Sequence, residues 1–259
     1  MARRNRKTNL PAPFLQRLWV DGALDPGLGY PFNLPWLSGS FELEFTTPIT
    51  IIIGENGTGK SSLIEAVAAL SGYDEAGGGK GYMPVDHSNA IDRSGAELRS
   101  ILRAGWLPKV TNGWFFRAES FFSVARYLDE AARESGGAPP DFLSWSHGEG
   151  FLTFFEERMS RQGIYFMDEP ESALSPKRQM ELLRILHRIG ESAVSQVIMA
   201  THSPLLMALP GARVIEITRR GFQEADYRDS MHFRMYQAFT IDPEEFVREA
   251  LAGTEDSML

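Results

Sequence analysis

Short apolar runs recur along this chain, and stretches of helical periodicity follow them. The run at residues 49–53 is β-branched and continuous, which is typical of a strand covered on both faces of a parallel sheet. After it, Leu63, Val67 and Leu70 repeat at helical spacing. Further apolar runs predict strands at residues 114–117, 164–167, 197–200 and 214–217. Strands that alternate with helices predict an α/β fold whose sheet is mostly parallel and flanked by helices.

Helical periodicity is clearest in the segment that follows Pro176. Its buried stripe would consist of Leu182, Ile185, Leu186 and Ile189. Arg184 and Arg188 lie on another face, where they either contact a nucleic-acid backbone or form a solvated surface with Glu181. Further helices are predicted at residues 93–103, at residues 120–135 and after Gly150.

Two breaks in the pattern divide the chain. Residues 75–81 and 136–140 are rich in glycine or proline and are too flexible to form elements. We interpret the region of about residues 82–160 as a small helical subdomain inserted in a single domain of residues 1–259, because helical patterns dominate it. No internal repeat and no heptad pattern is found.

The composition excludes several classes of protein. The chain has 259 residues, 43% of them hydrophobic, and it contains no cysteine, so disulfides and thiolate metal sites are excluded. No apolar run approaches the roughly 20 residues that span a bilayer, so we expect no membrane segment and a cytoplasmic protein. The net charge of −8 argues against a protein coated in nucleic acid. Arg3, Arg4, Arg6 and Lys7 form a local basic cluster, which a solvated terminal tail also explains.

The segment that follows residues 49–53 has the pattern of a phosphate-binding P-loop. It reads Gly54-Glu55-Asn56-Gly57-Thr58-Gly59-Lys60-Ser61, and Ser62 follows it at the start of the helix. The glycines let the backbone curl so that successive N–H groups point at one anion, and the N-terminus of the helix adds partial positive charge. Lys60 can reach the β- and γ-phosphates, and the hydroxyl of Ser61 is placed to ligate Mg²⁺. Strand, loop and helix follow in the required order, so we expect residues 54–62 to bind a nucleotide.

Residues 18–53 form a β-rich lead-in, which ends with the strand at residues 49–53 directly before the P-loop. Residues 41–45 alternate between apolar and acidic, which leaves one face of a strand in water. Three aromatic residues, Phe14, Trp19 and Tyr30, come before the P-loop. One of them could stack on the nucleotide base, or all three could pack in the core.

Carboxylates follow the strand predicted at residues 164–167. Asp168 and Glu169 stand at its C-terminal end, the edge at which ligands bind in open α/β sheets. Asp168 would hold Mg²⁺, directly or through water, and Glu169 would polarise the water that attacks the γ-phosphate. His202 follows the next predicted strand in the same manner, where an imidazole can hydrogen-bond a γ-phosphate and the catalytic carboxylate. We therefore expect Glu169 and His202 to be catalytic.

A serine and a glycine stand between these elements, at the start of a predicted helix. The stretch reads Ser144-Trp145-Ser146-His147-Gly148-Glu149-Gly150. Ser146 can cap the helix, and Gly148 leaves room for a phosphate to approach its N-terminus. Capping alone would explain a serine here, and the order of the motifs is the reason to expect more.

With its motifs in this order, the chain resembles the ABC-type ATPases, specifically the RecF/SMC-like branch and the short stand-alone ATPases related to it. The resemblance covers about residues 18–217. The matching segments are the Walker A residues 54–61, a signature at residues 146–149 that varies Ser-Gly-Gly-Gln, the Walker B pair Asp168 and Glu169, a D-loop at residues 172–174 and the switch histidine His202. Unlike SMC proteins, this chain has no pattern for long coiled-coil arms.

The resemblance implies ATP and Mg²⁺ as cofactors and a head-to-tail homodimer that forms on ATP binding. Ser146 and Gly148 of one copy would contact a γ-phosphate held by the other. The family's Q-loop glutamine is missing between Lys60 and Ser146, and Glu119 is our candidate to replace it as a metal ligand, unless it is a solvated residue at the end of a strand. Ser175 stands where many relatives carry aspartate or histidine, which leaves communication between subunits open.

The leading functional hypothesis is Mg²⁺-dependent ATP hydrolysis coupled to this dimerisation. By analogy it would act in DNA maintenance or in defence against foreign nucleic acid, with a nucleic acid or an unidentified protein as partner. A nucleotide-gated binding platform with little turnover is an alternative, although it would not need Glu169. The energising subunit of a membrane transporter is disfavoured by the missing Q-loop glutamine, and a phosphotransferase is disfavoured by Ser146 and His202.

Overall fold

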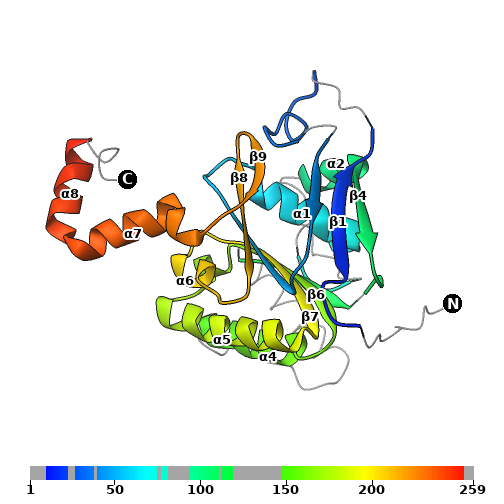
Figure 1. Cartoon of the computed structure of the whole chain (residues 1–259). Coiled ribbons are helices and arrows are strands. Elements are labelled where there is room, and N and C mark those ends of the chain that lie inside the picture. The colour runs from blue at the N-terminus through cyan, green and yellow to red at the C-terminus, as the bar shows by residue number, and fades with distance from the viewer. Residues whose placement is uncertain are drawn as a thin grey trace.

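In a computed structural model, the described part of the chain contains two β-sheets with helices packed on them, and a helical segment that extends away from them (Figure 1). The structure describes residues 10–22, 27–37, 40–74, 77–80, 94–110, 112–118 and 147–253. The predicted α/β fold with a mostly parallel sheet flanked by helices is confirmed, and so is the β-rich lead-in.

The larger sheet has six strands in the order β5-β6-β7-β3-β8-β9. Its parallel strands are β3 (Ile49–Ile53), β5 (Gly113–Arg117), β6 (Gly163–Asp168), β7 (Ser195–Ala200) and β8 (Arg213–Thr218), and β9 (Gly221–Glu224) is an antiparallel edge. Ala200 of β7 pairs with Ile52 of β3 on one side and with Asp168 of β6 on the other. The chain segments that follow these three strands therefore leave the sheet at one edge.

The smaller sheet is antiparallel and consists of β2 (Glu42–Glu44), β1 (Leu15–Val20) and β4 (Leu102–Trp106), with β1 in the centre. In β2 Leu43 is buried while Glu42 and Glu44 are exposed, as the alternation predicts. The amide of Gln196, fully buried in β7, links the two sheets. Its Oε1 accepts hydrogen bonds from the backbone N–H groups of Phe14 and Leu15, both at 2.8 Å, and its Nε2 donates to the carbonyl oxygen of Leu15 at 2.9 Å.

The helix α1 (Lys60–Ser71) lies in the core that the two sheets share. Its side chains Leu63, Ile64 and Val67 belong to one buried cluster with Leu18 of β1 and Ile198 of β7. Because α1 contacts apolar side chains on more than one side, nearly all of its residues are buried. The short helix α2 (Ser94–Ile101) packs on α1.

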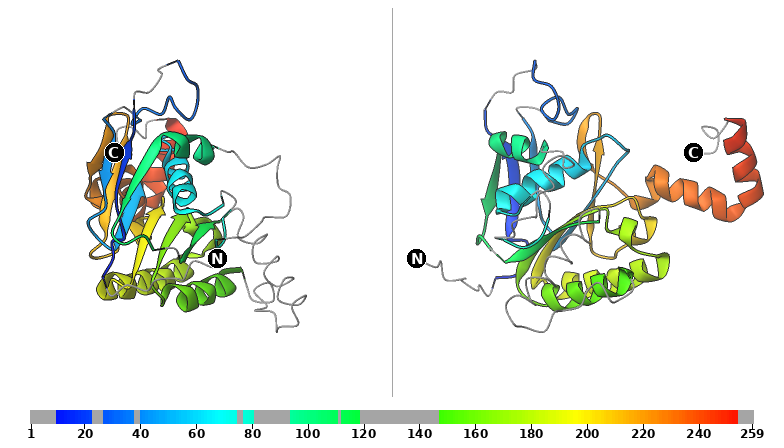
Figure 2. Two further views of the ribbon diagram at one scale, coloured as in Figure 1. Left: turned by 90° about the vertical axis from the view of Figure 1, so that its right-hand side faces the viewer. Right: turned by 180° about the vertical axis from the view of Figure 1, so that it is seen from behind.

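The opposite face of the larger sheet is covered by α4 (His147–Met159), α5 (Pro176–Ser192) and the short α6 (Pro204–Met207) (Figures 1 and 2). The predicted stripe of α5 is buried there, as Leu182, Ile185, Leu186 and Ile189 all contribute to this second core. A 3-10 turn, η1 (Pro170–Ala173), joins β6 to α5.

Two C-terminal helices, α7 (Met231–Ile241) and α8 (Pro243–Ala252), extend away from the sheets (Figure 1). We call residues 231–252 the C-terminal arm. None of its residues is buried, and several large apolar side chains are exposed: Met231, Met235, Tyr236, Phe239, Ile241, Val247 and Leu251. The sequence patterns did not predict this arm. Across the described ranges, none of the helices has the length and apolar character that crossing a membrane demands.

The region predicted to be a helical subdomain contributes to both sheets where the structure describes it. The prediction of a helix at residues 93–103 is wrong at the C-terminal end. The helix α2 ends at Ile101, and Leu102 begins β4, which pairs with β1. The aromatic run predicted as a strand is β5, an edge of the larger sheet. The helix predicted at residues 120–135 lies outside the described residues, and the boundaries of the subdomain stay a prediction.

Candidate active site

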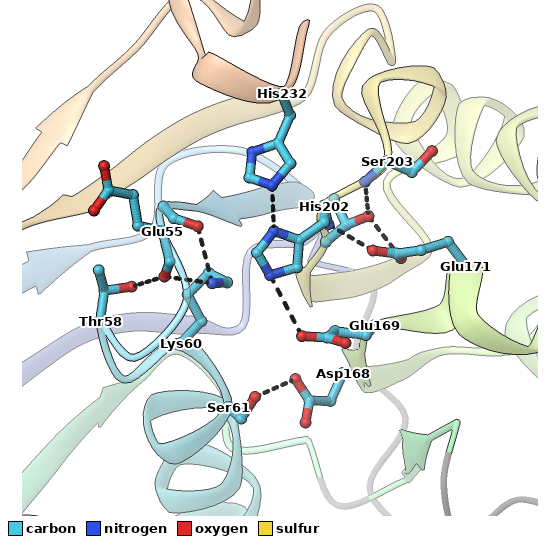
Figure 3. A network of polar contacts seen from close by, with 12 residues as sticks. Glu55, Thr58, Lys60, Ser61, Asp168, Glu169, Glu171, His202, Ser203 and His232 are labelled. Carbon is cyan, nitrogen blue, oxygen red and sulfur yellow. Dashed lines mark hydrogen bonds and ion pairs between the residues drawn. The ribbon is translucent and has the colours of Figure 1, made fainter. Parts of the chain in front are cut away.

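The loop after β3 curls around the ammonium group of Lys60 (Figure 3). Lys60 Nζ donates hydrogen bonds to the carbonyl oxygens of Gly54 and Glu55, both at 2.9 Å, and the residue is only 5% exposed. The hydroxyl of Thr58 donates to the same carbonyl oxygen of Glu55 at 2.8 Å. The loop is therefore closed by its own side chains around a single buried cation.

Two positions of this loop require glycine. Gly59 has a φ of 88°, and a Cβ there would lie 2.7 Å from the side chain of Leu34. Gly54 has a φ of 146°, and a Cβ there would lie 2.6 Å from a backbone carbonyl oxygen of β8. The lead-in supports the loop from outside, because Trp36 Nε1 donates to the carbonyl oxygen of Thr58 at 2.8 Å. The two glycines thus let the loop turn where the lead-in and β8 leave no room for a side chain.

The charge of Lys60 is held next to three carboxylates. Burial lowers the pKa of Lys60, and the negative charges of Glu169, Asp168 and Glu171 oppose this by raising it. No acidic residue occupies the first turn of α1, whose N-cap is Gly59. A phosphate at this point would meet the Lys60 ammonium and the positive end of a helix together.

The side chains predicted to hold Mg²⁺ meet at the end of β6. The hydroxyl of Ser61 at the start of α1 donates to Asp168 Oδ1 at the end of β6 at 3.0 Å, although the two residues are 107 positions apart in the sequence (Figure 3). Hydroxyl and carboxylate oxygens are hard ligands of the kind Mg²⁺ takes. Within the described ranges, no group of three or more His, Asp or Glu side chains is arranged to hold a metal ion. A Mg²⁺ at Ser61 and Asp168 would thus be completed by phosphate oxygens and water, as is usual for this ion.

Glu169 faces the imidazole of His202. The distance from Glu169 Oε1 to His202 Nε2 is 3.4 Å, which is long for a hydrogen bond, and this buried nitrogen has no well-aligned partner among the described residues. The interaction with His202 nevertheless lowers the pKa of Glu169, against the raising effect of burial. Glu169 has a left-handed backbone with a φ of 46°, which is unusual for a residue with a side chain. Its N–H donates to the carbonyl oxygen of Ala200, which ties this strained turn to β7.

Glu171 holds the chain that carries His202. Its Oε2 accepts a hydrogen bond from the hydroxyl of Thr201 at 2.7 Å, and its Oε1 accepts from the backbone N–H of His202 at 2.5 Å. Burial raises the pKa of Glu171, and the hydrogen bonds from His202 and Thr201 oppose this rise. We did not predict Glu171 from the sequence. The signal available was a third carboxylate placed two residues after Glu169.

A second histidine, also missed from the sequence, reaches the site from the C-terminal arm. His232 Nε2 lies 2.7 Å from His202 Nδ1, and the two ring centroids are 4.6 Å apart (Figure 3). Burial is the main cause that lowers the pKa of His232, and the nearby charges of His202 and Lys60 add to it. His202 therefore stands between Glu169 and His232, with one ring nitrogen directed at each.

Of the three aromatic residues considered for stacking on the base, Tyr30 lies beside the start of α1. The hydroxyl of Tyr30 is 2.5 Å from Ser62 Oγ, and the residue is 52% exposed. Phe14 is fully buried in the core, and Trp19 packs under the guanidinium of Arg17. Packing in the fold thus accounts for Phe14 and Trp19.

The remaining predicted residues are placed only in part. Asn56 and Gly57 line a cavity of about 410 Å³, together with Glu55, Thr58 and residues 216–219. Gly148 falls in the first turn of α4. Ser146 and Glu119 lie outside the described residues, so their roles as nucleotide and metal contacts stay predictions.

Two family models match segments of the chain that contain these elements. A model described as "AAA domain" matches residues 33–99, which include the P-loop. A model described as "AAA domain, putative AbiEii toxin, Type IV TA system" matches residues 150–208, which include Asp168, Glu169 and His202. The two matches lie on the two halves of the site. A search by sequence found no match among curated proteins.

Solved structures with a similar arrangement of elements are distant in sequence. The SMC head domain from Thermotoga maritima has 15% identity and a TM-score of 0.43, over 82% of this chain and 98% of that chain. The cbiO1 protein from Clostridium perfringens, part of the ABC transporter complex cbiONQ, has 14% identity and a TM-score of 0.44, over 91% and 99%. An ATP-binding cassette of an ABC transporter has 12% identity and a TM-score of 0.47, over 92% and 98%.

Proposed function

We propose that this chain, an ABC/SMC-like ATPase, binds ATP at residues 54–62 and hydrolyses its β–γ anhydride at the ends of β3, β6 and β7. The single observation that carries the proposal is the hydrogen bond of 3.0 Å between Ser61 and Asp168. It unites the P-loop with the acidic end of β6, where Glu169 pairs with His202. Binding and hydrolysis of a nucleoside triphosphate need these groups together.

Each side chain has one task in this proposal. Lys60 binds the β- and γ-phosphates once it exchanges the loop carbonyl oxygens for phosphate oxygens. Ser61 and Asp168 would hold Mg²⁺, which neutralises developing charge on the phosphates when it is bound. Glu169, whose pKa is lowered, stays a carboxylate at neutral pH and can orient a water molecule and accept its proton. His202 keeps Glu169 in place and presents Nε2 toward the γ-phosphate position.

Closure of the site by a second copy is the further part of the proposal. The side chain of Glu169 keeps 41% of its surface exposed, whereas phosphoryl transfer to water is favoured in a site that excludes bulk solvent. Ser146 and Gly148 of a second chain, in a head-to-tail pair, would supply the missing wall. ATP would then hold the two copies together, and hydrolysis would release them.

The face of α5 carries the arginines that could contact a nucleic-acid backbone. Of the two arginines named from the sequence, Arg188 pairs with Glu156 and is partly neutralised. Glu181, expected beside Arg184, pairs with Arg178. The family model that matches residues 150–208 carries the words toxin and TA system in its description, which agrees with a defence role. This biological role rests on analogy alone.

The hydrolysis proposal is tested by phosphate release with ATP and Mg²⁺. Lys60→Ala should lower kcat/KM about 100-fold or more, because one charged donor to the transferring phosphate is lost. Lys109→Ala is the matched control, since Lys109 is exposed at the end of the smaller sheet and packs over Trp106. Equal rates in the wild type and Lys60→Ala would show that any activity arises elsewhere.

The dimer proposal is tested by size-exclusion chromatography with light scattering. Glu169→Gln should trap a dimer in ATP and Mg²⁺, because binding is kept while hydrolysis is slowed. Lys60→Ala should stay monomeric under the same conditions. A Glu169→Gln protein that remains a monomer at saturating ATP would contradict the closure by a second copy.

A further inference from the structure

The contact between His202 and His232 joins the proposed catalytic edge to the C-terminal arm. The rings meet at 2.7 Å between His202 Nδ1 and His232 Nε2, a distance that requires a shared proton. Two N–H groups directed at each other would repel, and two bare nitrogens would not attract. One nitrogen of this pair therefore donates and the other accepts.

The other side of the His202 ring decides which nitrogen donates. Nε2 faces the carboxylate of Glu169 at 3.4 Å, and a carboxylate favours a proton on the nitrogen that it faces. In neutral His202 the proton is then on Nε2, and Nδ1 is an acceptor. It follows that His232 donates its Nε2–H to His202 Nδ1.

His232 is fixed at the start of the arm by local hydrogen bonds. Ser230, which is buried, caps α7 by accepting from the N–H of Phe233 at 3.2 Å and donates its hydroxyl to the carbonyl oxygen of Tyr227 at 2.6 Å. Beyond this first turn, α7 and α8 have no buried residue. A cavity of about 530 Å³ lies between α5, α6 and α7 and is lined in part by His202 and His232. The histidine contact is thus one of the contacts through which the arm meets the body of the protein.

We propose that His232 is a positioning residue for the ATPase reaction: its Nε2–H holds His202 in the tautomer and orientation that present Nε2–H to Glu169 and the γ-phosphate. This rests on the function proposed above. It also makes hydrolysis depend on the docking of the C-terminal arm, because displacement of α7 would remove the donor. His232 itself does not contact the phosphate.

The kinetic test compares two variants of His232. His232→Leu removes the donor and should lower kcat about 10-fold while KM for ATP changes less than about twofold, since a loss of one hydrogen bond in the pair corresponds to about a factor of ten. His232→Gln places an amide N–H where the imidazole Nε2–H was and should recover most of kcat. Tyr236→Ala, one turn further along α7 and 62% exposed, is the control for general disturbance of the arm and should match the wild type. Equal kcat values for His232→Leu and the wild type would overturn the inference.

The tautomer can also be read without turnover. The chain has five histidines, so their ring ¹⁵N signals can be assigned by single substitutions in NMR spectra of the full chain. The wild type and His232→Gln should show His202 protonated at Nε2 with Nδ1 accepting, and His232→Leu should lose this pattern. An unchanged His202 spectrum in His232→Leu would overturn the inference even if the wild type hydrolyses ATP. If the wild type does not hydrolyse ATP, the proposed function fails, and the spectra alone decide whether His232 sets the His202 tautomer.

Discussion

Glu171 offers a test in which two substitutions of similar size have different effects. Glu171→Leu removes the acceptor of the Thr201 hydroxyl and of the His202 backbone N–H, and Thr201 is fully buried. A buried donor left without an acceptor costs about 1–3 kcal/mol, so two of them cost about 2–6 kcal/mol. Because the wild type also has to bury a carboxylate, we expect a net loss of about 2–4 kcal/mol in the free energy of unfolding.

Glu171→Gln keeps an oxygen that can accept from the His202 N–H and offers an N–H₂ group to the Thr201 oxygen. It removes a carboxyl group whose pKa is raised by burial above its ordinary value of 4.5. The folded protein holds this proton more tightly than the unfolded chain does. The stability that the group contributes is fully present below pH 4.5 and is lost as pH rises through the folded-state pKa. The stability of Glu171→Gln relative to the wild type should therefore increase with pH above 4.5.

The assay is urea denaturation of the wild type and both variants at several pH values, with the rate of phosphate release measured alongside. Glu171→Leu should be less stable at every pH and should lose at least about 10-fold in kcat, because His202 loses its anchor. Glu171→Gln should keep most of its activity. The reasoning is refuted if Glu171→Leu matches the wild type in both stability and kcat, or if the stability of Glu171→Gln relative to the wild type decreases as pH rises.

Three further predictions concern the sheets, the metal ligands and the loop. Gln196→Leu should lower the free energy of unfolding, measured by urea denaturation, by about 3 kcal/mol or more. The reason is that three buried backbone groups, the N–H of Phe14 and the N–H and C=O of Leu15, lose their partner. A loss below about 1 kcal/mol would mean that Gln196 does not join the sheets. Ser61→Ala should raise the Mg²⁺ concentration that gives half-maximal hydrolysis about 10-fold, since one oxygen ligand is removed. An unchanged Mg²⁺ requirement in this titration would place the metal ion elsewhere. Gly59→Ala should abolish binding of a fluorescent ATP analogue and lower the free energy of unfolding by about 1–3 kcal/mol. The cause is that Gly59 has a φ of 88° and that Leu34 occupies the space of a Cβ at this position. Wild-type affinity in this variant would show that the loop adapts without strain.

The sequence predicts well those parts of the protein whose signal is local. A continuous β-branched run can only be a buried element, and Ile49–Ile53 is β3 with every residue buried. Parallel strands bring their C-terminal ends to one edge, which is why Ser61 and Asp168 could be expected to meet.

Other parts depend on contacts between distant segments. Leu102–Trp106 carries no alternation of its own, and its pairing with β1 decides that it is a strand. His232 is a lone histidine in a helix without a buried face, so nothing local marks it. Glu171, directly before the D-loop at residues 172–174, looks like a solvated residue until Thr201 and His202 are placed against it. The signature serine Ser146 and Glu119 stay predictions from the order of motifs.

The central claim is that Glu169 activates the water that cleaves ATP at this edge of the sheet. Single-turnover decay of γ-labelled ATP, with enzyme in excess and Mg²⁺ present, measures this step without product release. The account predicts that Glu169→Gln binds ATP as the wild type does and cleaves it about 100-fold or more slowly, as expected for loss of a general base. Cleavage by Glu169→Gln at the wild-type rate would contradict the account.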